Sequence, residues 1–169
     1  MSVEINFSQP STLRQFELIV EKKSIFVNAH FLAEISPYFE LLCFGNFREA
    51  SEGRAELEDE IYDDVVEFMQ FICPDSNYMA AKKITDRNFA ILAHFSHVMQ
   101  FPQLRKQLEW FLENELDSTR LRNENMIDMI VEATEAAFPP RLIDNIYVKL
   151  AELGSEKIKE VLFYFISIT

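Results

Sequence analysis

The residues most able to hold a metal ion are two histidines, His94 and His97, three positions apart on an expected helix. Such spacing lets both imidazoles face one ion, but a structural zinc site needs four ligands. His30 is distant in sequence, and the two cysteines lie inside apolar runs. We therefore interpret the histidines as structural and predict no metal site.

The cysteines, Cys43 and Cys73, are the remaining candidates for nucleophilic chemistry. Cys43 lies between Leu42 and Phe44, with no histidine or basic neighbour in sequence to lower its thiol pKa. There is no CxxC pair, so a reduced, buried role is the simpler interpretation. The sequence also contains no glycine-rich phosphate loop, nucleophile elbow or HExxH helix. These patterns predict no catalysis and no cofactor.

Acidic side chains outnumber basic ones, 28 to 16, and the formal net charge is −12. Because such a surface repels phosphate backbones on average, nucleic acid is not an expected partner. One short cluster comprises Glu56, Glu58, Asp59, Glu60, Asp63 and Asp64. Its spacing differs from that of a calcium loop, so a solvated turn between a strand and a helix is favoured over a cation site.

The elements that position these residues begin with two short β-branched and aromatic runs, 16–21 and 25–27, around a polar turn at 22–24. They predict a β-hairpin. Asn28 should cap a helix over 29–35, and Ser36 with Pro37 should start another that reaches about Phe44. We expect Gly45 and Asn46 to end it with positive φ, leaving Phe47 to Glu49 in the turn beyond.

A third strand is expected around 55–57, followed by a helix over 62–72 that Pro74 ends. Beyond it, Thr85 should cap a helix through about Val98, and further helices are expected over 103–115, 125–137, 142–153 and 156–168. Trp110 and Phe111 are expected on a buried helical face, and Met79, Met126 and Met129 as core fillers. The order predicts a small α+β domain that passes into an all-α module near residue 117.

An ordered set of segments carries a family resemblance. The segments are Leu18-Ile-Val-Glu-Lys-Lys, Phe26-Val-Asn28, Leu32, Ser36-Pro-Tyr-Phe39, Phe47-Arg-Glu49, and Leu57-Glu-Asp59 leading to Val65-Val-Glu-Phe-Met-Gln-Phe-Ile72. Over about residues 7–115 they resemble the BTB/POZ fold. Phe7-Ser-Gln-Pro-Ser11 and Ile72-Cys-Pro74 look most like the BTB half of MATH–BTB proteins, although no MATH segment is present. The resemblance implies an N-terminal segment (1–14), a BTB/POZ domain (15–116) and a helical extension resembling the 3-box or BACK region (117–169).

The sequence departs from the family at three places. Gln15 stands where an Asp is usual, Asn28 where a His is usual, and residues 1–14 contain Pro10 and little helical periodicity. The resemblance still implies a homodimer, but without the N-terminal helix that many BTB dimers exchange.

The resemblance also implies a function, which is recruitment of cullin-3 by a substrate adaptor of a ubiquitin ligase. Members that bind cullin-3 carry an apolar-x-Glu motif after the second helix, and Phe47 and Glu49 occupy the matching positions. One alternative is that Phe47 packs inward; another is a self-association or scaffolding module that does not bind cullin-3. The substrate protein is not specified. No apolar stretch approaches the ~20 residues of a membrane span, so a cytoplasmic or nuclear protein is expected and no membrane partner.

Overall fold

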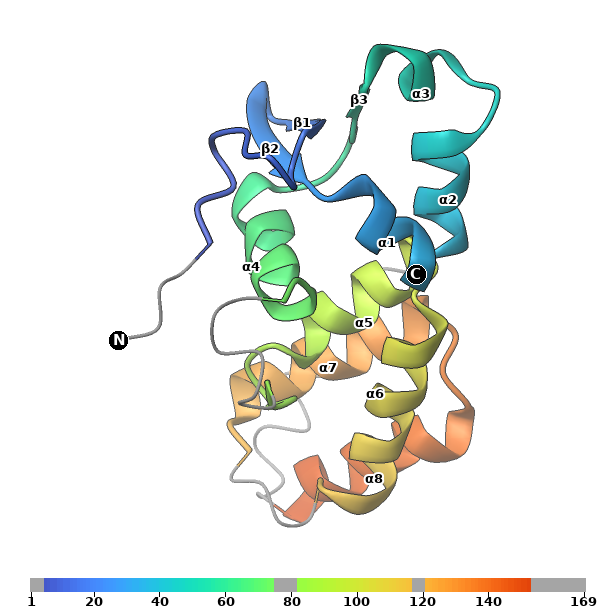
Figure 1. Cartoon of the computed structure of the whole chain (residues 1–169). Coiled ribbons are helices and arrows are strands. Elements are labelled where there is room, and N and C mark those ends of the chain that lie inside the picture. The colour runs from blue at the N-terminus through green and yellow to red at the C-terminus, as the bar shows by residue number, and fades with distance from the viewer. Residues whose placement is uncertain (1–4, 75–81, 117–120, 153–169) are drawn as a thin grey trace. The chain divides into compact units, whose positions relative to one another are not determined.

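The computed structural model describes residues 5–74, 82–116 and 121–152 (Figure 1). The strands are β1 (Phe16–Val20), β2 (Lys23–Val27) and β3 (Arg54–Glu56). The helices of the described residues are α1 (Ala29–Ile35), α2 (Pro37–Phe44), α3 (Arg48–Glu52), α4 (Tyr62–Ile72), α5 (Phe89–Val98), α6 (Pro102–Asn114), α7 (Asn123–Glu135) and α8 (Pro140–Glu152). The α+β class predicted from the sequence is therefore confirmed.

The three strands form one sheet in the order β2-β1-β3. β1 and β2 pair antiparallel from Phe16 opposite Val27 to Val20 opposite Lys23, and β3 runs parallel to β1. The hairpin is confirmed, but its turn is Glu21-Lys22 and starts one residue earlier than predicted. Both turn residues have positive φ, 48° and 65°, as in the type I′ turn that matches the twist of a hairpin.

Two local capping signals place α1 and α2. The Asn28 side chain accepts a hydrogen bond from the Phe31 amide at 3.1 Å, and the Ser36 hydroxyl accepts one from the Phe39 amide at 3.1 Å. Ser36 is buried and also donates to the Met99 carbonyl at 2.6 Å. Both helices have the predicted bounds because a side-chain acceptor pairs an amide that each first turn would leave free.

The described residues divide into two compact units, within Met1–Lys83 plus Met99–Pro102 and within Ile84–Val98 plus Gln103–Thr169. In the first unit, which we call the sheet unit, Leu18, Ile25 and Val27 are buried on the strands. The Phe101 ring lies 5.9 Å from Phe39 and 5.2 Å from Phe68, centroid to centroid. Helix α4 has the predicted bounds and contributes Val65, Phe68 and Met69 to this core.

The N-terminal part of the sheet unit, residues 5–14, contains bends at 8–9 and 12–13 and no helix, in agreement with the weak helical pattern. The Phe26 amide donates to the Phe7 carbonyl at 2.7 Å, and Gln70 donates to the Ile5 carbonyl at 2.7 Å. These contacts hold the segment against β2 and α4.

The second unit, which we call the helical unit, contains α5, α7 and α8 and the part of α6 from Gln103. Its core includes Phe89, whose ring centroid lies 5.9 Å from Phe111 and 6.0 Å from Phe138. Met126 and Met129 are buried as predicted. Met79 and the helix expected over 156–168 lie outside the described residues. None of the described helices is long and apolar enough to cross a bilayer.

Two details of the helical unit differ from the prediction, the first residue of α5 and the burial of Trp110. Helix α5 begins at Phe89, later than Thr85; the Phe89 amide donates to the Thr85 carbonyl at 3.0 Å, and the Thr85 amide and hydroxyl donate to the Asn88 side chain at 2.8 and 3.2 Å. Trp110 is 54% exposed, although Phe111 beside it is buried. The buried stripe of α6 runs through Leu104, Leu108, Phe111 and Leu112. Trp110 follows Leu108 by about 200° around the helix and so faces away from that stripe.

Candidate protein-interaction surface

The candidate motif residues lie at the start of α3. Phe47 is the residue before its first turn and is 59% exposed, and Glu49 lies in that turn, half-buried. The sequence placed both residues in an irregular turn, whereas the structure forms a five-residue helix there. Gly53 ends it with φ 67° and an amide that donates to the Glu49 carbonyl. This glycine is the sequence signal that could have revealed α3, because a left-handed glycine often ends a helix.

Gly45 brings α2 and Phe47 close together. Its φ of −73° is ordinary, so the predicted positive φ was wrong. The reason for a glycine is steric: a Cβ there would overlap the Leu41 carbonyl oxygen and lie 3.0 Å from Cδ2 of the Phe47 ring. The ring therefore lies against the backbone that ends α2, and its position depends on the missing side chain.

Two further apolar side chains are exposed near this point, Leu41 at 60% and Phe44 at 50%. Both lie on α2, whose buried residues are Phe39 and Cys43. The His30 ring of α1 contacts Phe44, with ring centroids 4.9 Å apart. We name Leu41, Phe44, Phe47 and Glu49 the α2–α3 surface; Figure 1 shows α2, α3 and β3 following one another along the chain. Leu41 and Phe44 were not predicted as surface residues from the sequence, although both lie off the buried stripe of α2.

The histidines do not gather as ligands. His94 Nδ1 lies 3.4 Å from a carboxylate oxygen of Glu132 on α7, and its ring contacts Phe95 edge-on at 4.9 Å. His97 is exposed. Across residues 5–74, 82–116 and 121–152, no group of three or more His, Cys, Asp or Glu side chains is arranged to hold a metal ion. The contacts of His94 are those of a side chain that joins α5 to α7.

Both cysteines are buried and free, as predicted. Burial raises the pKa of the Cys43 thiol to about 12. The pKa of Cys73 rises to about 11, chiefly through burial, while Lys82 and Arg14 oppose the shift. Because the thiolate is the reactive form, both residues are poor nucleophiles near neutral pH.

The acidic cluster occupies the connection from β3 into α4. Glu56, Glu58, Asp59 and Asp63 are exposed, as the solvated-turn prediction requires. Asp63 and Asp64 lie in the first turn of α4, where the helix dipole favours negative charge. The cluster thus supports the start of a helix.

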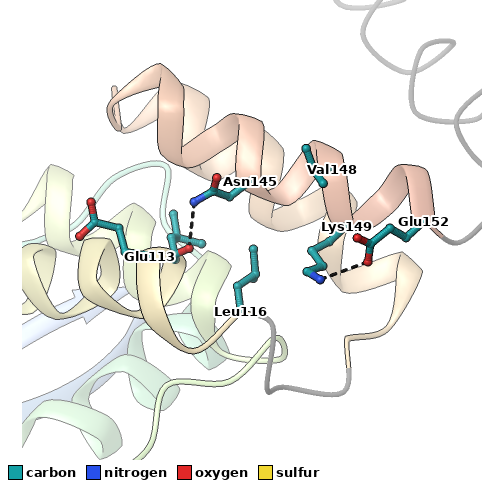
Figure 2. A pocket seen from close by; sticks show the side chains of 7 residues that line it. Glu113, Leu116, Asn145, Val148, Lys149 and Glu152 are labelled. Atoms are coloured by element: carbon teal, nitrogen blue, oxygen red, sulfur yellow. Dashed lines mark hydrogen bonds and ion pairs between the residues drawn. The ribbon is translucent and has the colours of Figure 1, made fainter.

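A pocket of about 370 Å³ lies in the helical unit between the end of α6 and α8 (Figure 2). Asn145 donates to the Leu112 carbonyl at 3.2 Å, and Lys149 pairs with Glu152 at 3.1 Å. A fourth polar lining residue, Glu113, pairs with Arg141. The contacts of Asn145 with Leu112 and of Arg141 with Glu113 hold α8 against α6, whereas the Lys149–Glu152 pair lies within α8.

Comparison with known proteins agrees with the fold and the motif order. Residues 6–116 match the BTB/POZ domain family. The chain therefore belongs to the BTB/POZ family and carries a protein-interaction module of that class.

Two curated relatives, both from Caenorhabditis elegans, match the same region. The chain is 31% identical to "BTB and MATH domain-containing protein 38" over 107 residues, which is 62% of this chain and 26% of that protein. It is 29% identical to "Cytokinesis defective protein 7" over 109 residues, 63% of this chain and 38% of that protein. The similarity thus spans well under half the length of each relative.

Proposed function

We propose that this chain is a substrate adaptor of a cullin-3 RING ubiquitin ligase, and that it acts by binding and not by catalysis. In this proposal Phe47 and Glu49 contact cullin-3. The observation that carries it is the exposed Phe47 ring, 59% accessible, two residues before a carboxylate in the first turn of α3. An inward-packed Phe47, the alternative left open by the sequence, disagrees with that exposure.

The physical basis is an anchor next to an orienting group. An exposed aromatic ring can enter a groove on a partner and exclude water, and it loses little conformational freedom in doing so. A nearby carboxylate can accept hydrogen bonds from the partner and so fix its orientation. The backbone that carries both groups is held by α3 and by the contact of the ring with Gly45.

Family membership supports three further parts of the proposal. The chain forms a homodimer, which is how BTB domains commonly associate. Helices α7 and α8 lie beyond the end of the family match at residue 116 and belong to an extension, residues 117–169, that supports cullin-3 binding. The protein works in the cytoplasm or nucleus, where buried free thiols such as Cys43 stay reduced. The substrate is another protein.

A second candidate is a self-association or scaffolding module that does not bind cullin-3. Exposed apolar side chains outside the motif favour it, namely Leu13 at 70% and Ile61 at 57% in the sheet unit. Such residues can bury against a second copy without any cullin.

The double variant Phe47→Ala with Glu49→Ala separates the two candidates. The adaptor proposal expects its affinity for cullin-3 in calorimetry to fall at least about tenfold, equal to about 1.4 kcal/mol, with an unchanged circular dichroism spectrum. The scaffolding candidate expects no cullin-3 binding by the wild type, whereas both candidates expect self-association in sedimentation. Equal cullin-3 affinity of wild type and folded double variant would refute the proposed contact.

A further inference from the structure

Phe47, the apolar residue of the motif, is only one of the three exposed apolar side chains of the α2–α3 surface. We propose that Leu41 and Phe44 contact the partner together with Phe47, that Gly45 positions the Phe47 ring, and that the partner segment carries apolar side chains flanked by lysine or arginine. The inference rests on the proposed function, because it takes cullin-3 as the partner that Phe47 contacts.

The contact between α2 and Phe47 makes these side chains one surface. Leu41 and Phe44 are three residues apart on α2 and so share a helical face. The Phe47 ring lies against Gly45, the residue directly after Phe44. All three side chains are at least half exposed. Adjacent exposed apolar groups of this size are characteristic of interaction sites.

The packing beneath the surface holds its aromatic rings in place. The His30 ring contacts Phe44 from α1, and Gly45 leaves the space that the Phe47 ring occupies. Rings held in advance lose less conformational entropy when a partner binds. Gly45 is therefore a positioning residue, which acts on the partner through Phe47.

Charge defines the chemistry of the partner. Glu34 lies one helical turn after His30, Glu40 lies one turn before Phe44, and Glu49 follows Phe47 by two residues. Within the described part of the chain, none of these three carboxylates forms an ion pair, whereas Arg48 pairs with Glu52 at 3.5 Å. An apolar centre with an acidic rim is complementary to an apolar segment with basic flanks.

Calorimetry of purified full chain with purified cullin-3 tests the apolar part. Leu41→Ala with Phe44→Ala is expected to weaken binding at least about tenfold. The matched control is Leu13→Ala, which truncates another exposed leucine of the same unit, and its affinity should stay within about twofold. If Phe47→Ala weakens binding but the α2 double variant behaves like Leu13→Ala, the wider surface is refuted while the proposed function stands. If the wild type does not bind cullin-3, both fail.

Gly45→Ala tests positioning through its coupling to Phe47. Alone it should weaken binding at least as much as Phe47→Ala, since its Cβ also overlaps the Leu41 carbonyl oxygen. Added to Phe47→Ala it should cost less than the sum of the two separate losses, because the ring it displaces is gone. Additive losses would refute the positioning role. Misfolding of Gly45→Ala that persists with Phe47→Ala would also refute it, and the Leu41 and Phe44 arm is independent of that result.

Charge reversal tests the rim. Glu40→Lys should weaken cullin-3 binding several-fold and reduce its sensitivity to salt. Glu67→Lys, an exposed reversal on α4 of the same unit, is the control for net charge. Equal effects of the two reversals would refute the basic character assigned to the partner segment.

Discussion

Replacement of Arg105 is the sharpest test of how the helical unit is held together. Arg105, on α6, donates from Nη1 to the Ala136 carbonyl at 2.6 Å and from Nη2 to the Ala137 carbonyl at 2.8 Å. Its guanidinium also lies 4.4 Å from the Phe138 ring centroid and pairs with Glu109 at 3.3 Å. One side chain thus binds the carbonyl groups that end α7, which intrahelical bonding leaves free.

The magnitude follows from these contacts. A hydrogen bond from a charged donor contributes about 1.5–3 kcal/mol, and a cation–π contact contributes about 0.5–1 kcal/mol when partly exposed. The surface pair with Glu109 contributes about 0.3–0.5 kcal/mol. Water can reach the freed carbonyls of a helix end, so we take the lower values, which together give an expected cost of about 4 kcal/mol of unfolding free energy for Arg105→Met. Arg105→Lys should cost about half as much, because lysine keeps the charge without the two-pronged donor.

Urea denaturation followed by tryptophan fluorescence reports on unfolding of the helical unit, because the one tryptophan of the chain, Trp110, lies on α6. Lys106→Met, an exposed substitution on the same helix, is the matched control and should change stability by less than about 0.5 kcal/mol. If Arg105→Met unfolds at the same urea concentration as Lys106→Met, the capping role is wrong. Equal stability of Arg105→Lys and wild type would show that charge alone suffices.

Three further outcomes are expected. Phe47→Ala should lower the unfolding free energy by less than about 1 kcal/mol, whereas Phe39→Ala, at a fully buried ring, should cost about 3–5 kcal/mol in the same denaturant titration; similar losses would mean that Phe47 is a core residue. Cys43 and Cys73, with pKa values of about 12 and 11, should label slowly with a thiol reagent at pH 8 and rapidly in urea. Fast labelling of the native protein would contradict their burial. Sedimentation should show a concentration-dependent dimer, and monomer mass up to about 100 µM would refute the homodimer.

The parts of the fold that could be predicted are those set by near neighbours. Asn28 and Ser36 each bond an amide three residues away, so residue type and spacing fixed the starts of α1 and α2. The β1–β2 hairpin likewise follows from two adjacent runs. Phe47 and Glu49 could be singled out because the family motif is a short segment in a fixed place along the chain.

Other features could not be predicted because they depend on contacts between residues far apart in the sequence or on the angular position of a side chain around its helix. Arg105 reaches the Ala136 carbonyl 31 residues away, and Asp86 accepts hydrogen bonds from the Arg122 amide and the Asn125 side chain. Trp110 was expected to be buried among apolar neighbours, but its angular position on α6 points it away from the buried stripe and exposes it. Helix α3 is shorter than the window in which helical periodicity can be recognised.

Binding of cullin-3 by this chain is tested most directly by a calorimetric titration of purified cullin-3 into the wild-type chain at physiological salt. An adaptor that binds cullin-3 through Phe47 should show saturable binding in the micromolar range or tighter, the affinity expected of a specific interface built on an anchored aromatic residue. The absence of saturable heat at concentrations up to about 100 µM, for a chain that is folded by circular dichroism, would contradict the proposed adaptor function.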